Sequence, residues 1–403
     1  MTNMVAAKLV GGAKAELGVP YIYNMKPGTT RRLSAARARV RSGSSPGGSR
    51  YSLAFYGDSR FAGVPGETPE LGKTGRIASI PTVLASMLTS AGGLPSAVDS
   101  FTGSGGQADP TAYDLYNSTF TDRGSGWVFS TNISTGGNNW ACNNTTDVLP
   151  IRRLDGGSFD AVLIWAIDSP LRTLNVVTTP GGSPVGSFTT GGTGVLKPFY
   201  VALGSSVSVA YLRQNATNSP VSVNSAFARR TGTTELEIYN LGRASWRASH
   251  LADTGTAYAP LNALVSRAHD FVFCNTATND GLYAKTLSGS AVTDFTRGTG
   301  TGSFKADYQA IINAVKGYGG GFAIVVPAAS QPSTQVPQEI QDQLRQSLYD
   351  LALSNDVPLI DFALRNGSYA EAAGNGLISG GLHETRVGYN DQAWAVAQFI
   401  TRA

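Results

Sequence analysis

The sequence feature that most constrains the fold is an apolar run that ends abruptly in a polar turn. Residues 51–56 (YSLAFY) are uncharged and rich in aromatic side chains, and Gly57, Asp58 and Ser59 follow them directly. A short run of this kind is typical of a central strand that is covered on both faces. Ligands in open α/β sheets bind beyond the carboxyl ends of the strands, so Ser59 is predicted to lie where a nucleophile is useful. Gly-Asp-Ser is also an ordinary turn sequence and does not identify a catalytic serine by itself.

Three later stretches carry further candidate functional residues. Residues 271–280 (FVFCNTATND) read as a second buried strand that ends in Asn279 and Asp280. Residues 379–389 (SGGLHETRVGY) place His383 in a glycine-rich loop before the last predicted helix. Residues 236–246 (LEIYNLGRASW) form a third strand-and-turn segment. Ser59, Asn279 and His383 therefore span the chain in the order serine, asparagine, histidine.

This set resembles the SGNH (GDSL-type) hydrolase family, whose four blocks carry a nucleophilic serine, an oxyanion-hole glycine, an oxyanion-hole asparagine and a base histidine. Ser59, Asn279 and His383 match three blocks. The glycine block is matched in part, since Gly242 is present but Ser245 stands at the usual second glycine.

The resemblance implies that Ser59 is the nucleophile and His383 the base, and that Ser59 and Ser245 backbone N–H groups act with the Asn279 amide as the oxyanion hole. The residues expected to contact substrate are Asp58, Arg60, Gly242, Trp246 and Trp140.

The last block departs from the family pattern, which normally reads Asp-x-x-His, because position 380 is glycine. Glu384 and Asp361 are candidate substitutes for the missing acid. A main-chain carbonyl within residues 379–381 is the alternative that we expect to orient His383, since it fixes the tautomer without adding a charge.

The order of elements predicts an α/β fold with one interruption. Strands and helices alternate from residue 231 to the end, which favours a three-layer α/β/α doubly wound parallel sheet, as in SGNH hydrolases and flavodoxin-like folds. Residues 107–230 instead carry short strand-like runs separated by Gly-, Asn- and Pro-rich turns, which predicts an inserted all-β sandwich of jelly-roll type. The expected divisions are residues 1–106 (the N-terminal segment and first part of the hydrolase domain), 107–230 (a carbohydrate-binding-like insert) and 231–403 (the remainder of the hydrolase domain).

Tryptophans of the insert could stack on sugar rings. Trp165 lies in an apolar strand and is expected in the core, whereas for Trp140 the sequence leaves core packing and sugar stacking open.

Composition excludes several classes of function. The formal net charge of +4 over 403 residues comes without any block of five like charges, so nucleic acid is not an expected partner. Two cysteines and three histidines show no metal-ligand spacing, and no metal or cofactor is expected. No apolar run approaches the roughly 20 residues of a membrane span, and the N-terminus has no recognisable signal peptide. The sequence thus predicts a soluble protein.

The resemblance and the insert together are similar to the arrangement of glycan O-acetyl esterases. The implied partner is an acylated polysaccharide or a small ester, and a phage tail or a prophage is the implied setting. The expected location is virion-associated or extracellular if the protein is phage-derived, and cytoplasmic otherwise. The competing class is a glycan-binding protein whose hydrolase site is inactive. The oligomeric state is left open.

Overall fold

The computed structural model describes residues 21–43, 50–64, 75–108, 110–117, 120 and 122–403. The described residues form a central seven-stranded sheet in which all strands but the first run parallel. Its spatial order is β1 (Ile22–Tyr23), β17 (Leu359–Asp361), β16 (Gly321–Val326), β15 (Phe271–Asn275), β2 (Tyr51–Gly57), β14 (Leu236–Gly242) and β3 (Ser96–Val98).

Strand β2 is the point at which the strand order reverses. The chain continues from β2 to β3 and β14 on one side and to β15, β16 and β17 on the other. Gly57, at the carboxyl end of β2, is in register with Gly242 of β14 and Asn275 of β15. A Cβ at position 57 would lie 2.1 Å from the Asn275 carbonyl oxygen, so only glycine permits this approach. The residues after β2 therefore lie at the topological switch point, where open α/β sheets bind ligands.

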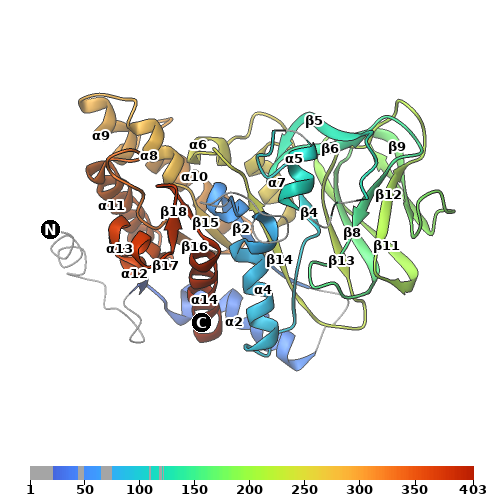
Figure 1. Cartoon of the computed structure of the whole chain (residues 1–403), viewed down its shortest axis with the longest axis horizontal. Helices are drawn as coiled ribbons and strands as arrows, with labels where there is room; N and C mark the ends of the chain where they lie inside the picture. The colour runs from blue at the N-terminus through green and yellow to red at the C-terminus, as the bar shows by residue number, and fades with distance from the viewer. Residues whose placement is uncertain (1–20, 44–49, 65–74, 109, 118–119, 121) are drawn as a thin grey trace.

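Helices cover both faces of this sheet (Figure 1). Successive β2 residues alternate between two apolar clusters, as the strand period of two requires: Leu53 and Phe55 belong to one, and Ala54 and Tyr56 to the other. The first cluster also contains α2 (Pro27–Ser42), α4 (Ile80–Ser90) and α14 (Arg386–Arg402), and the second contains α7 (Pro260–Arg267), α10 (Phe304–Gly317) and α11 (Gln338–Ser354). The parallel sheet is thus buried on both sides. The shorter helices are α3 (Ser59–Ala62), η3 (Gly75–Ala78), α6 (Ala248–Leu251), α8 (Thr278–Ala284), α9 (Ser290–Arg297), α12 (Phe362–Asn366) and α13 (Tyr369–Gly374).

Between β3 and β14 the chain forms a β-rich part, which lies beside the α/β part in Figure 1. One antiparallel sheet has the order β10 (Gly186–Gly191), β9 (Pro170–Val177), β12 (Ala210–Gln214) and β7 (Val148–Ile151). The other has the order β11 (Leu196–Val207), β8 (Phe159–Ile167), β13 (Val223–Arg229), β6 (Gly137–Cys142) and β5 (Trp127–Ser134), and β4 (Phe101–Thr102) also pairs with β13. Side chains of both sheets, such as Ile164 and Val176, share one apolar core. The jelly-roll connectivity stays a prediction.

This part differs from the all-β expectation in two respects. Helix α5 (Pro110–Tyr116) lies within it, and its Tyr113 packs edge-on against the Trp140 indole at 5.1 Å between ring centroids. The antiparallel pairing also begins with β4, before residue 107. Strand β3 was missed as well, because its three residues are too few to show a strand period.

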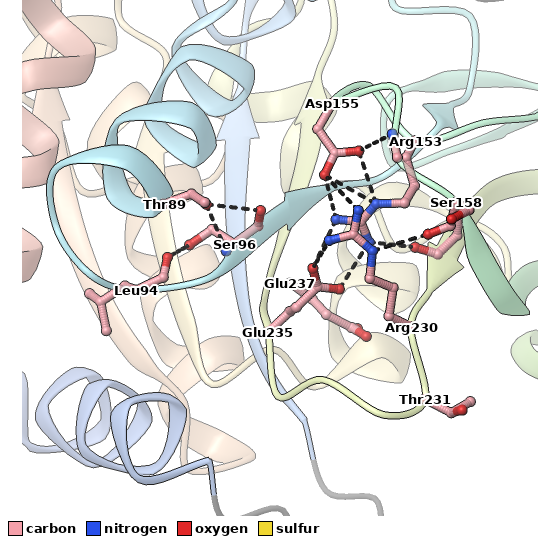
Figure 2. Close-up of polar contacts among 12 residues, drawn as sticks. Thr89, Leu94, Ser96, Arg153, Asp155, Ser158, Arg230, Thr231, Glu235 and Glu237 are labelled. Atoms are coloured by element: carbon pink, nitrogen blue, oxygen red, sulfur yellow. Dashed lines mark hydrogen bonds and ion pairs between the residues drawn. The ribbon is translucent and has the colours of Figure 1, made fainter. Parts of the chain in front are cut away.

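The two parts are joined by apolar packing and by a buried ion-pair network. Figure 2 shows the network, in which Arg153 donates two hydrogen bonds of 2.9 and 2.8 Å to the Glu235 carboxylate. Arg153 also donates to Asp155 at 2.7 Å, and Arg230 lies 3.4 Å from Glu235. Arg153 and Glu235 are each only 2% exposed. Because Arg153 follows β7 and Glu235 precedes β14, the network connects the β-rich part to the amino-terminal side of the central sheet.

Candidate active site

Ser59 is the first residue of the short helix α3, which begins directly after β2. The Asp58 carboxylate caps this helix by accepting the Arg60 N–H at 3.0 Å. The end of β14 lies close behind the helix, and a Cβ at Gly242 would lie 2.3 Å from the Ala62 nitrogen. Gly242 therefore admits α3 to the sheet edge and is itself buried. The turn sets the Ser59 hydroxyl at the carboxyl edge of the sheet.

His383 reaches this serine from the other end of the chain. It lies on β19 (His383–Glu384), which pairs with β18 (Ile378–Ser379), and its Nε2 is 2.9 Å from Ser59 Oγ. The pKa of His383 is lowered to about 4, chiefly by burial and also by the Arg60 charge, while the Glu384 charge acts in the opposite direction. The imidazole is therefore neutral at pH 7 and can accept the hydroxyl proton.

A buried ion pair ties the serine and histidine segments together. The Arg60 guanidinium is paired with the Glu384 carboxylate, and both side chains are fully buried. Arg60 also donates to the Leu382 carbonyl at 2.6 Å, and Gln392 donates to Glu384 at 2.8 Å. The residue after Ser59 thus holds both neighbours of His383. Sequence reasoning missed this pair, although an Arg directly after the serine and a Glu directly after the histidine were its signal.

These contacts correct several expected substrate contacts. Arg60 is occupied by Glu384, and Asp58 is fully buried, where burial raises its pKa to about 8. Trp246 is buried, with the Arg243 guanidinium 4.7 Å from its ring centroid. Trp140 is fully buried and its Nε1 donates to the Gly103 carbonyl at 3.1 Å. Arg60, Asp58, Gly242, Trp246 and Trp140 therefore support the site or the core and do not present a surface for a sugar ring.

Two residues expected in the oxyanion hole are Ser245, on the loop after β14, and Asn279, in helix α8. Ser245 is exposed and adopts a φ of 65°, the left-handed conformation that a glycine at this position of the family pattern adopts readily. Asn279 is half-buried at the start of α8, and its Nδ2 donates to the Trp246 carbonyl at 3.0 Å. The Asn279 side chain is thus held beside the loop that carries Ser245.

None of the three groups expected to orient His383 is bonded to it. Asp361 caps α12 through the Leu364 N–H at 2.7 Å and accepts from Arg345 and from Tyr349, so both carboxylate oxygens are engaged elsewhere. Glu384 is bound to Arg60 and Gln392. Among the described residues, the Ser59 contact is the one side-chain hydrogen bond of His383, and no carbonyl of residues 379–381 accepts from Nδ1.

The β-rich part contacts the candidate site from one side. The Tyr116 hydroxyl of α5 donates to the Ala62 carbonyl of α3. Arg243, two residues before Ser245, donates to the Asn138 side chain of β6 at 3.2 Å. The Gly105 carbonyl accepts the Ala244 N–H at 3.2 Å. Helix α3, which carries Ser59, and the loop that carries Ser245 are therefore buttressed by residues that the sequence assigned to the insert or its border.

The described part of the chain holds no group of three or more His, Cys, Asp or Glu side chains suited to a metal ion. Within the same residues, no helix combines the length and apolarity needed to cross a bilayer.

The protein is similar to known proteins in structure but not detectably in sequence. No family model matches the chain, and no curated protein is detectably similar in sequence. A solved peptidoglycan O-acetylesterase matches 94% of this chain and 99% of its own, with a TM-score of 0.65 and 14% sequence identity. A lipase/acylhydrolase from Enterococcus faecalis matches 42% of this chain and 77% of its own (TM-score 0.32, 15% identity), and an acetyl xylan esterase matches 40% and 79% (TM-score 0.31, 18% identity). The first of these likenesses shows a shared mixed α/β fold across nearly the whole chain, and the structural neighbours include SGNH (GDSL-type) hydrolases.

Proposed function

We propose that this protein is a serine esterase that removes short acyl groups, chiefly O-acetyl groups, from a polysaccharide. The observation that carries the proposal is the 2.9 Å contact between His383 Nε2 and Ser59 Oγ at the switch point of the sheet. Nucleophile and base within hydrogen-bond reach are the arrangement that acyl transfer requires. The fold shared with a peptidoglycan O-acetylesterase supports the choice of an acetylated glycan.

In the proposed mechanism, His383 Nε2 takes the proton of Ser59 as Oγ attacks the ester carbonyl carbon. The Ser59 and Ser245 N–H groups and the Asn279 amide stabilise the oxyanion, each donor contributing about 10²–10³ in rate. His383 then returns the proton to the departing sugar oxygen, which leaves an acyl-enzyme on Ser59. His383 then takes a proton from a water that attacks the acyl carbon, the bond from that carbon to Ser59 Oγ breaks, and His383 returns the proton to Ser59 Oγ as the acid is released.

The alternative, an inactive glycan-binding protein, lacks a reason for the close Ser59–His383 contact. A neutral imidazole in contact with a serine hydroxyl is explained by a catalytic role more readily than by packing. The phage-tail setting and a sugar-binding role for the β-rich part stay predictions.

The proposal is tested with Ser59→Ala and an aryl acetate substrate. We expect turnover to fall to background while the free energy of unfolding changes by about 1 kcal/mol or less, because the hydroxyl supplies chemistry and little packing. Ser90→Ala, at an exposed serine that ends α4, is the matched control and should keep full activity. A Ser59→Ala protein that turns over the ester like the wild type would refute the assignment.

A further inference from the structure

Two arginines flank Ser245 at equal distance along the chain, and neither has a carboxylate partner. Among the described residues, no carboxylate oxygen lies within 4.0 Å of the Arg243 or Arg247 guanidinium. Each is instead stacked on an aromatic ring, Arg243 at 4.7 Å from the centroid of Trp246 and Arg247 at 4.0 Å from that of Tyr283. Stacking fixes the plane of a guanidinium and leaves its edge N–H groups free to bind an anion.

The loop that carries both arginines lies next to the candidate nucleophile. The main-chain N–H of Arg243 donates to the carbonyl of Gly57 at 2.9 Å, and Gly57 is two residues before Ser59. At the other end of the loop, Asn279 donates to the Trp246 carbonyl at 3.0 Å. The two guanidinium groups therefore lie on opposite sides of Ser245, Arg243 toward Asn138 of β6 and Arg247 toward α8.

The surroundings leave this loop positively charged. Arg243 Nε is buried without a partner, and burial lowers the pKa of the Arg243 guanidinium. Burial also lowers the pKa of the adjacent His250, with Arg247 and Arg243 as further causes, so His250 adds no charge at pH 7. Asp280 and Asp307 are within electrostatic reach of Arg247, but neither forms an ion pair with it within 4.0 Å, and the Asp280 oxygens accept the Ala248 N–H at 3.1 and 3.2 Å. A half-buried cation without a directly bonded carboxylate is a place where an anion gains binding energy.

We propose that Arg243 and Arg247 form a subsite for anionic groups of the substrate, so that the preferred substrate is an O-acetylated glycan that carries carboxylates. The planar donor fork of arginine matches a carboxylate in two parallel hydrogen bonds. This inference rests on the proposed esterase function and names its substrate class.

The test uses two substrates that differ at one carbon. O-acetylated methyl galacturonoside carries a carboxylate at C6, whereas O-acetylated methyl galactoside carries a hydroxymethyl group there. Acetate release is measured for both, and for 4-nitrophenyl acetate, with the wild type, Arg243→Gln, Arg247→Gln and Arg247→Lys. Arg31→Gln is the matched control, because it removes the same charge from an exposed site on α2.

We expect the wild type to prefer the galacturonoside in kcat/KM, and each glutamine variant to lower that value about tenfold, mainly through KM. In Arg247→Gln, the galactoside and the aryl acetate should change less than about twofold, and Arg247→Lys should keep part of the preference because it keeps the charge. Arg243→Gln also loses the hydrogen bond to Asn138, so we expect it to lower turnover of all three substrates, with the largest loss on the galacturonoside. Arg31→Gln should behave as the wild type. Raising the salt concentration should reduce the preference.

Equal losses on all three substrates would mean that the arginines only support the fold, and a wild type without preference would also overturn the inference. Either result leaves the esterase assignment intact, provided that aryl acetate turnover depends on Ser59. Absence of Ser59-dependent turnover in the wild type would instead refute the proposed function itself.

Discussion

His383 is kept neutral by its surroundings, without a bonded carboxylate. Burial is the largest cause of its lowered pKa, and Arg60 adds to the effect. An imidazole with a pKa near 4 is neutral at pH 7, but the imidazolium formed during the proposed reaction has no carboxylate hydrogen-bonded to it, because Glu384 is bonded to Arg60 and Gln392. The site therefore stabilises the His383 imidazolium less, but its neutral imidazole is present over a wide pH range.

The activity of the wild type is accordingly expected to rise as the pH passes about 4 and to stay flat above. Activity rises with pH because the base must be unprotonated, and it falls when the pH drops below the pKa of His383. The Gly380→Asp variant, with a carboxylate three residues before the histidine, should raise that pKa and move the acidic limb upward by about one pH unit or more. Profiles of kcat/KM for an aryl acetate between pH 3.5 and 8 measure both effects.

Gly380→Asn is the matched control for this prediction. Gly380 has a φ of 61°, and Asn and Asp tolerate this left-handed conformation better than other side chains. Both variants carry the same backbone strain, so a difference between them reports the charge alone. Identical acidic limbs in the two variants would show that position 380 does not face the imidazole.

At the scale of elements, the Arg60–Glu384 pair connects α3 to β19 across the whole chain. Arg60 directly follows Ser59 and Glu384 directly follows His383, so a change in the distance between Arg60 and Glu384 also changes the distance between Ser59 and His383. Removing one member would leave a buried charge without a partner, which costs about 3–5 kcal/mol and confounds any effect on catalysis. Replacing both with apolar residues of similar size avoids this cost.

We therefore expect Glu384→Gln to lose stability, and Arg60→Met/Glu384→Met to stay folded with kcat reduced about 10- to 100-fold on an aryl acetate. The physical reason is that a shift of about 1 Å between reacting groups costs about 100-fold in rate. Unchanged KM and unchanged thermal stability in the double variant would separate positioning from unfolding. A stable double variant with full kcat would show that the pair contributes to the fold alone.

Periodicity predicted the long elements well and the short ones poorly. Helices α10 and α11 and strand β16 lie where their apolar patterns place them, because each spans enough residues to show a period. Strand β3 and helix α5 have three and seven residues, and tertiary contacts hold them. For the site, local motifs predicted the contact between His383 and Ser59, and the roles of the site residues stay predictions. They did not predict that Arg60 and Asp58 would be buried, because burial depends on segments more than 200 residues away, such as Glu384 and Asn275.

At the scale of the whole molecule, the two parts are not independent modules. Leu163, Trp165 and Phe227 of the six-stranded sheet belong to the same apolar cluster as Tyr239 and Trp246 of the α/β part. The contacts of Tyr116 and Asn138 with the site loops add to this interface. Cutting out residues 107–230 would therefore expose apolar surface and remove supports of the candidate active site.

The buried junction network, drawn in Figure 2, provides the test of this coupling. It lies at the amino-terminal end of β14, whereas Ser59 follows the carboxyl end of the neighbouring parallel strand β2. Arg153→Met leaves Glu235 buried with only the more distant Arg230 nearby, so we expect the free energy of unfolding to fall by about 3 kcal/mol. Two parts that share a core unfold together, so hydrogen-exchange protection should fall equally in β8 and in β15. Asp350→Asn is the control, since it breaks a partly exposed pair with Lys305 and should change stability by about 1 kcal/mol or less. Protection lost in β8 but kept in β15 would show instead that the β-rich part unfolds on its own.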